Sequence, residues 1–225
     1  MTRPMISTLA DPADLDFSPG EVKQLWWFRD GAIMSVPIRD RLWDARGLCH
    51  RHAWGYAILE IELLAGQAFS TAVLYADLTD RAAKLVGKRG MRKPKLNADG
   101  PCMTCDHIRT TASQTLTGAE WPRGAVRVNR AETARELVSE TESVWRAASC
   151  PACGLGGSGP TCRPHLIAGA PAPAGLSDTL ADIAGRLEPL VSSMTVARTT
   201  VGLAEQASWI EAIGWFTGWT SIERC

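Results

Sequence analysis

Apolar residues recur at helical spacing through most of the chain, and no segment of useful length alternates between apolar and polar residues. The strongest pattern covers residues 53–65, and a second apolar run covers residues 68–86 beyond Gly66. Together these two runs predict a helical hairpin or one long kinked helix. The pattern as a whole predicts an all-α fold.

Local signals place the other helices. Residues 18–21, Ser-Pro-Gly-Glu, are typical of a helix start with Ser18 as the N-cap, and they predict a helix to about residue 33. Further helices are expected over about residues 37–45, 106–116, 132–148, 177–186 and 201–219. Residues 120–130 are expected to be irregular because they contain Pro122 and Gly124.

Six of the seven cysteines and two of the four histidines form four pairs with a two-residue gap. Residues 102–105 and 150–153 are C-x-x-C pairs, whereas residues 49–52 and 162–165 are C-x-x-H pairs. Zinc favours four such ligands in a tetrahedron, and two side chains from one tight turn can reach the same ion. The predicted cofactor is therefore zinc, in two Cys3His sites. The predicted ligands are Cys49, His52, Cys102, Cys105, Cys150, Cys153, Cys162 and His165.

The pairs can combine in two ways. In the local arrangement, pairs 150–153 and 162–165 share one ion, and pairs 49–52 and 102–105 share the other. In the crossed arrangement, pair 102–105 combines with pair 162–165. The local arrangement is favoured because closing a short loop costs less entropy. His50 and His107 are off spacing and are interpreted as supporting or surface histidines.

These motifs fit a simple domain organisation. Residues 1–17 are expected to be a flexible leader, and residues 18–225 a single helical zinc-binding domain with metal-bound turns. That domain is either undivided or made of two pseudo-related halves, residues 18–87 and 101–225, joined by a basic linker at 88–100.

Composition narrows the class of partner. The 24 basic and 24 acidic residues balance, so no global field favours nucleic acid or an anionic membrane. No apolar signal segment follows Met1, and cysteines in metal-type spacing favour a reducing cytoplasm over a disulfide framework. Cys225 is interpreted as a free terminal thiol, and the basic run 84–95 as a solvated linker. The expected partner is a small molecule or a protein, with neither nucleic acid nor membrane.

Nine tryptophans are many for 225 residues. We expect them to pack in the core. The alternative is that they line an apolar small-molecule pocket. Trp215 and Trp219 lie four residues apart beside Phe216, so that part of the last helix is a candidate homodimer surface.

Several motifs together resemble an uncharacterised, actinobacterial-type family with a domain of unknown function. They are GLCHRHAW at residues 47–54, AVLYADL at 72–78, CRPHL at 162–166, EQASW at 205–209 and GWFTG at 214–218. The family pairs C-x-x-C with G-[FL]-C-x-x-H-A-W and later repeats C-x-x-C with C-x-P-H-L. The resemblance implies a helical fold with bound metal, and it implies no reaction.

The chain departs from that family pattern at its beginning. The family has a C-x-x-C pair near its N-terminus, but residues 1–48 contain no cysteine, and pair 150–153 is additional. Either the additional pair replaces the missing one, or the site of Cys49 and His52 is two ligands short. A site with too few protein ligands could hold an exchangeable water.

The sequence leaves three functions to be compared. The favoured one is a cytosolic zinc-binding helical protein whose zinc is mainly structural and which acts through a partner or an aromatic-lined pocket. The alternative is a zinc-dependent hydrolase or lyase with an open site near Cys49 and His52. Thiol redox chemistry at Cys150 and Cys153 is disfavoured because no βαβ pattern surrounds them. Whether the protein is an enzyme, and with which catalytic residues, stays open.

Overall fold

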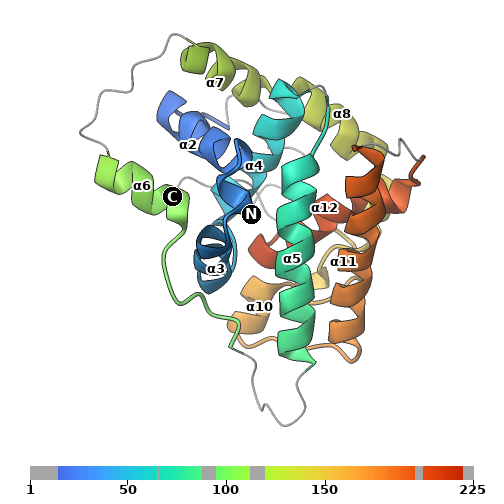
Figure 1. Cartoon of the computed structure of the whole chain (residues 1–225). Coiled ribbons are helices and arrows are strands. Elements are labelled where there is room, and N and C mark those ends of the chain that lie inside the picture. The colour runs from blue at the N-terminus through green and yellow to red at the C-terminus, as the bar shows by residue number, and fades with distance from the viewer. Residues whose placement is uncertain (1–14, 65, 88–94, 112–119, 196–199, 220–225) are drawn as a thin grey trace. The chain divides into compact units, whose positions relative to one another are not determined.

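The computed structural model describes residues 15–64, 66–87, 95–111, 120–195 and 200–219, with the side chains of residues 111 and 120–122 excepted. Within these ranges the chain forms helices and turns and contains no strand, which confirms the predicted all-α class (Figure 1). Residues 1–14 of the predicted leader, residues 88–94 of the basic linker and Cys225 lie outside the described residues. The elements are α2 (Pro19–Arg29), η2 (Ala32–Met34), α3 (Val36–Asp44), α4 (His50–Leu63), α5 (Phe69–Val86), α6 (Met103–Thr111), α7 (Glu120–Arg130), α8 (Glu132–Glu140), α9 (Glu142–Ala147), η3 (Pro151–Cys153), α10 (Arg163–Ile167), α11 (Leu176–Ser193) and α12 (Leu203–Thr217).

The chain divides into two compact units, and each is assembled from separate segments. Of the described residues, the first unit contains 15–70 and 98–137, with α2, α3, α4, α6 and α7. The second contains 71–97 and 138–219, with most of α5 and with α9 to α12. Helix α8 begins in the first unit and ends in the second.

Helix α2 begins as predicted and organises the first unit. The backbone N–H of Glu21 donates to the Ser18 hydroxyl at 3.2 Å, and the backbone N–H of Ser18 donates to the Glu21 carboxylate at 2.8 Å. This reciprocal pair satisfies two backbone donors that the helix cannot. Helix α2 packs against α4, α6 and α7. It ends at Arg29 and not near residue 33, because Gly31 takes a left-handed conformation with φ of 116°.

Helix α4 is buried from Arg51 to Glu62, polar residues included. The carboxylate of Glu60 accepts from the backbone N–H of Ser70 at 2.6 Å, in the first turn of α5. The carboxylate of Glu62 accepts from the backbone N–H of Ala134 at 2.9 Å, in the first turn of α8. Each negative charge lies at the positive end of a helix, where it is stabilising. The apolar runs 53–65 and 68–86 thus become two helices, separated at Gly66 by a φ of 80°.

Helix α12 carries the aromatic core of the second unit. It packs against α9, α10 and α11. The rings of Trp145 and Trp219 stack with centroids 5.8 Å apart, and Tyr75 meets Phe216 edge-on at 5.9 Å. Trp215 and Trp219 are only 2% and 1% exposed, so they belong to the core and the predicted dimer surface on them is wrong.

Two other expectations are wrong in detail. Residues 120–130, expected to be irregular, form α7, because Pro122 falls in the first helical turn where its missing N–H is tolerated. The helix expected to begin with Ser177 as its cap and to end before Pro189 is α11, which begins at Leu176 and contains both residues. The helix expected over 132–148 is interrupted at Thr141.

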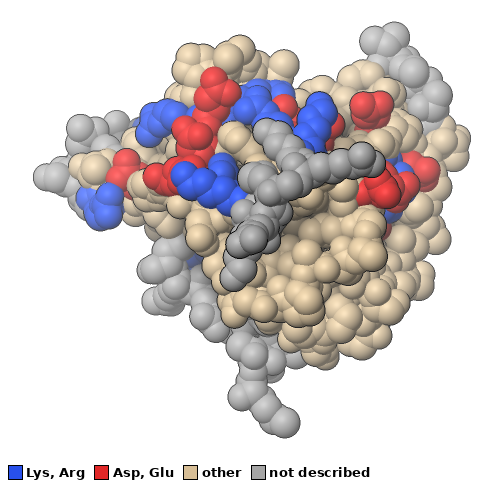
Figure 2. Space-filling model, turned by 90° about the horizontal axis from the view of Figure 1, so that it is seen from below, with Lys and Arg blue, Asp and Glu red and all other residues tan. Residues whose placement is uncertain are grey.

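The surface view shows no separation of charge. On the face in Figure 2, acidic and basic side chains lie next to one another. Among the described residues, no helix combines the length and apolarity that crossing a membrane requires.

Candidate metal centres

The structure gathers the eight predicted residues into two groups of four, in the local arrangement. Site 1 contains Cys49, His52, Cys102 and Cys105, and site 2 contains Cys150, Cys153, Cys162 and His165. One ligand atom from each residue lies within 4.8 Å of the others in its group. Site 1 lies within the first unit and site 2 within the second.

All four pairs use the same local geometry. In each, the first residue directly precedes a helix and the second is that helix's third residue; the helices are α4, α6, η3 and α10. Residues three apart share one face of a helical turn, so both side chains of a pair point to the same place. The N-terminal turn also presents backbone N–H groups and a partial positive charge, which favour thiolates.

The distances in site 1 match a tetrahedral ion. A zinc with usual bond lengths requires about 3.8 Å between two sulfur ligands and about 3.6 Å between sulfur and nitrogen. The Sγ atoms of Cys49 and Cys105 are 3.7 Å apart. The Nδ1 atom of His52 lies 3.3 Å, 3.6 Å and 3.4 Å from the Sγ atoms of Cys49, Cys102 and Cys105.

Site 2 has similar dimensions, with one shorter distance between sulfur and nitrogen. The Sγ atoms of Cys153 and Cys162 are 3.7 Å apart. The Nδ1 atom of His165 lies 3.6 Å, 3.6 Å and 3.0 Å from the Sγ atoms of Cys150, Cys153 and Cys162. A disulfide needs sulfurs about 2.05 Å apart, and the six described cysteines form no disulfide with one another. Both donor sets therefore suit a tetrahedral ion such as zinc.

Within each site, hydrogen bonds between neighbouring thiols shift their pKa values. Hydrogen bonds from Cys105 and Cys49 hold the pKa of Cys102 far below its usual range. A hydrogen bond from Cys162 lowers the pKa of Cys153 to about 6, while the same bond and burial raise the pKa of Cys162. Neighbouring thiols in each site compete for the same protons. A divalent cation that replaces those protons removes this competition.

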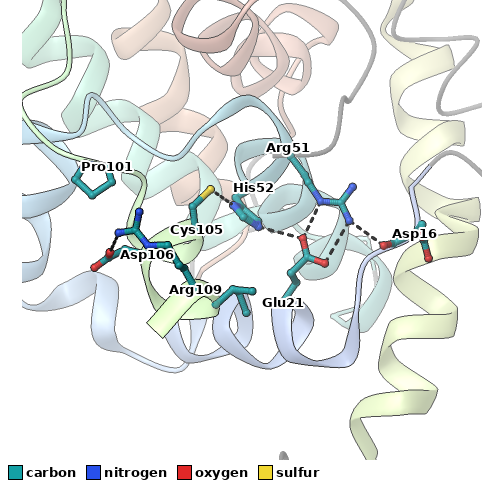
Figure 3. A pocket seen from close by; sticks show the side chains of 9 residues that line it. Asp16, Glu21, Arg51, His52, Pro101, Cys105, Asp106 and Arg109 are labelled. Atoms are coloured by element: carbon teal, nitrogen blue, oxygen red, sulfur yellow. Dashed lines mark hydrogen bonds and ion pairs between the residues drawn. The ribbon is translucent and has the colours of Figure 1, made fainter. Parts of the chain in front are cut away.

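The histidine of site 1 is held by a carboxylate that the metal-ligand motifs of the sequence did not include. The Nε2 atom of His52 lies 3.2 Å from Oε1 of Glu21, which leaves Nδ1 directed at the three cysteines. Figure 3 shows the contacts of His52 with Glu21 and with one of these cysteines, Cys105. Nε of Arg51 donates to the same carboxylate at 2.7 Å. Burial raises the pKa of Glu21, but hydrogen bonds from His52 and Arg51 outweigh this effect and lower it well below its usual range. A metal-binding histidine commonly donates its second N–H to a carboxylate in this way.

Arg51 connects this arrangement to the residues before α2. Its guanidinium also donates to the backbone oxygens of Leu15 and Asp16, at 2.9 Å and 2.8 Å. Arg51 is buried, and its charge is balanced by Glu21. The sequence signal for Glu21 was the helix-start motif, which identifies its capping role and not its contact with a histidine 31 residues later.

Site 2 is a short knuckle in which Cys150 and Cys162 are buried and Cys153 is half-buried. Cys150 and Cys162 have no exposed surface. The turn between the pairs closes through a hydrogen bond from the N–H of Gly159 to the carbonyl of Ser149 at 3.0 Å. A Cβ on Gly159 would lie 1.9 Å from the carbonyl oxygen of Ala148, so only glycine permits this approach. Arg163 donates to the backbone oxygens of Phe216 and Leu96, which ties the knuckle to α12 and to residue 96.

Site 1, in contrast, borders a cavity of about 510 Å³ (Figure 3). His52 and Cys105 form part of its wall, and none of the other metal-site cysteines lines it. The remaining lining residues are Asp16, Glu21, Arg51, Pro101, Asp106, Ile108 and Arg109. The cavity contains no tryptophan, so it is not the aromatic-lined pocket considered from the sequence.

The other sequence candidates take different places. His50 and His107 are half-buried and belong to neither group of four. Cys49 and His52 are joined by Cys102 and Cys105, so the expectation of a site two ligands short is wrong.

Comparison with known proteins finds no matching family model, no matching curated protein and no matching solved structure. The resemblance to an uncharacterised bacterial family therefore stays a prediction from the motifs.

Proposed function

We propose that this chain is a cytosolic zinc-binding helical protein in which two zinc ions are structural. The observation that carries the proposal is the pair of Cys3His groups with tetrahedral spacing. Four protein ligands close a zinc site, whereas catalytic zinc sites keep a position for water or substrate. Zinc thiolate sites require reduced cysteines, which the cytosol maintains.

The position of the sites supports a structural role. Site 1 links the start of α4 to the start of α6, which are about 50 residues apart in the sequence. Site 2 fixes a glycine-rich turn that contains only the short helices η3 and α10. Between Cys150 and Cys162, Leu155 is the one buried apolar side chain, so apolar packing contributes little to the shape of that turn. Zinc binding in comparable small sites contributes about 10–16 kcal/mol of apparent free energy, which becomes folding free energy.

A scaffold of this kind acts through what it binds. The cavity beside site 1 is the candidate place for a small molecule, and the assignment of zinc to sites 1 and 2 is independent of it.

Native mass spectrometry combined with circular dichroism tests the proposal. The purified protein is expected to carry two zinc ions, and chelation is expected to remove helical signal as it removes metal. A protein that keeps its full helicity after complete removal of both ions would overturn the structural role. A mass with no bound metal, in reduced protein supplied with zinc, would overturn the assignment of zinc.

A further inference from the structure

We propose that the corner between α7 and α8 is a docking surface for a second copy of this chain. Two exposed faces of opposite charge make up this surface: an arginine face on α7 and a glutamate face on α8. The residues of both faces belong to the first unit. The inference goes beyond the proposed function and is independent of the metal assigned to either site.

The arginine face of α7 carries three positive charges. It consists of four exposed residues, Arg123, Val126, Arg127 and Arg130. Their spacing of three and four residues places them on one side of the helix. Val126, which is 52% exposed, adds apolar surface between the charges. Residues 123–130 include no acidic residue that would neutralise this face.

The glutamate face of α8 carries the opposite charge. It consists of Glu132 and Glu136, which are both exposed and lie about one helical turn apart. Arg135 lies between them in the sequence, but its Nε and Nη2 atoms are buried. The charge that this face presents to a partner is therefore negative.

The chain's own side chains do not neutralise either face. Within the described part of the chain, no ion pair is formed by Arg123, Arg130, Glu132 or Glu136. Like charges one turn apart on the same helix repel each other. Arg123 also lies close to the start of α7, where the helix end disfavours a positive charge. An oppositely charged face that docks here relieves this repulsion.

Glu62 of α4 holds the corner between the two helices in a fixed geometry. Its backbone oxygen accepts a hydrogen bond from Nη2 of Arg127 in α7. Its carboxylate accepts a hydrogen bond from the backbone N–H of Ala134 in α8, at 2.9 Å. Helix α7 also packs against α2 and α4. The two faces are therefore arranged before a partner arrives, which lowers the free-energy cost of binding.

A second copy is the partner that fits both faces at once. In a dimer with two-fold symmetry, α7 of one copy meets α8 of the other, and the same contact occurs twice. Arg123 and Arg127 are four residues apart, as are Glu132 and Glu136, so both pairs span about 6 Å along their helices.

Charge also disfavours other partners at this corner. The glutamate face would repel an acidic partner, and the arginine face would repel a basic one. The whole chain has a formal net charge of zero, so two copies approach each other without overall repulsion. Exposed ion pairs are individually weak and are screened by salt, so the dimer is expected to be weak and salt-sensitive.

Sedimentation velocity of the full chain, at up to about 0.1 mM protein, tests the proposal. A reductant in the buffer prevents two copies from being joined through a disulfide. We expect a monomer–dimer equilibrium at about 0.1 M salt. The equilibrium should shift strongly to monomer at about 1 M salt, because the Debye length falls from about 10 Å to about 3 Å.

Arg130→Glu and Arg41→Glu are matched variants. Both arginines are exposed, and both lie in the last turn of their helices. Arg130→Glu is expected to weaken the dimer about tenfold or more, because it places like charges opposite each other. Arg41→Glu, on α3, is expected to leave the dimerisation constant unchanged.

Reversing the charge of each face, separately and then together, identifies the contact. The double variant Arg123→Glu with Arg130→Glu is expected to be monomeric, and so is Glu132→Lys with Glu136→Lys. The chain with all four substitutions keeps the net charge of the wild type and is expected to dimerise again, because the two faces have exchanged their charges. Circular dichroism confirms that each variant is folded.

Three results would overturn the proposal. The first is a wild-type protein that stays monomeric at about 0.1 M salt, where the screening length is still about 10 Å. The second is a dimer that Arg130→Glu leaves intact, or that Arg41→Glu weakens equally, because the interface would then lie elsewhere. The third is a folded variant with all four substitutions that remains monomeric.

Discussion

At the scale of single residues, Glu21 shows how one side chain serves two purposes. Its carboxylate accepts the backbone N–H of Ser18 at the start of α2 and also meets Nε2 of His52 in site 1. The beginning of a helix is thereby tied to a metal-binding group. Arg51 balances the charge of Glu21, which lowers the free-energy cost of burying the carboxylate.

Replacing Glu21 by Gln should weaken metal binding at site 1. Gln at this position can still complete the helix-start motif, but it removes the negative charge that orients the imidazole and pairs with Arg51. Loss of such an outer partner typically lowers metal affinity about 10–100-fold. Competition with a chelator measures the change, and the affinity of site 2 should stay the same.

Asp80→Asn is the control for Glu21→Gln, because it removes an exposed carboxylate paired with Lys84. It should change neither site. Equal affinity of site 1 in wild type and Glu21→Gln would show that the contact with His52 has no role in holding metal.

Gly159→Ala should disrupt site 2, because the new Cβ would collide with the carbonyl oxygen of Ala148. The expected result is a lower metal affinity at site 2 and a lower free energy of unfolding. Gly185→Ala is the matched control, since a Cβ there meets no atom outside its own helix within 4 Å. It should stabilise α11 by about 0.5–1 kcal/mol. Thermal unfolding with zinc counting compares the two, and an unperturbed site 2 in Gly159→Ala would contradict the close packing of the turn.

At the scale of elements, both candidate metal sites are built on helix starts. Each ligand pair occupies the position before a helix and the third position within it, so the C-x-x-C and C-x-x-H spacing carries the geometry directly. For this reason the four pairs could be recognised from the sequence, whereas the local grouping was favoured over the crossed one by the lower entropy cost of closing a short loop. The contact of Glu21 with His52 was not, because it depends on how α2 packs against α4. The sequence analysis also missed α7, because Pro122 falls in the first turn where proline is tolerated. It missed the continuation of α11 through Pro189, because tertiary packing outweighs a single unfavourable residue.

Glu62→Gln tests whether a buried carboxylate stabilises the start of α8. Gln can still accept a hydrogen bond from Ala134, but the charge at the helix N-terminus is lost. We expect a loss of about 1 kcal/mol in the free energy of unfolding, because a charge-assisted bond is roughly twice as strong as a neutral one. Glu136→Gln, at an exposed position on the same helix, should have almost no effect. Equal stability of the two variants in denaturant unfolding would argue against the capping role.

At the scale of the whole molecule, the two units each contain one metal site. Each unit is built from segments that are distant in the sequence. The contacts between these segments cannot be recognised from the spacing of hydrophobic residues. Metal binding should therefore be coupled to the fold of both units, because the ligands of each site converge only when its unit is formed.

Acid should unfold the protein by releasing zinc. Protons compete with metal for thiolates and imidazole, so metal affinity falls as the pH falls. Excess zinc favours the folded state by mass action and should move the unfolding transition to lower pH. Circular dichroism followed against pH, with and without added zinc, measures this shift. An unfolding transition whose midpoint pH is the same with and without added zinc would show that folding is not coupled to metal binding.

X-ray absorption spectroscopy at the zinc edge tests the two closed sites most directly. The account predicts an average zinc environment of three sulfur ligands at about 2.3 Å and one nitrogen ligand at about 2.0–2.1 Å. It predicts no oxygen ligand, because four protein side chains fill each site. An average of fewer than three sulfur ligands, or a bound water, would contradict the assignment of two closed Cys3His centres.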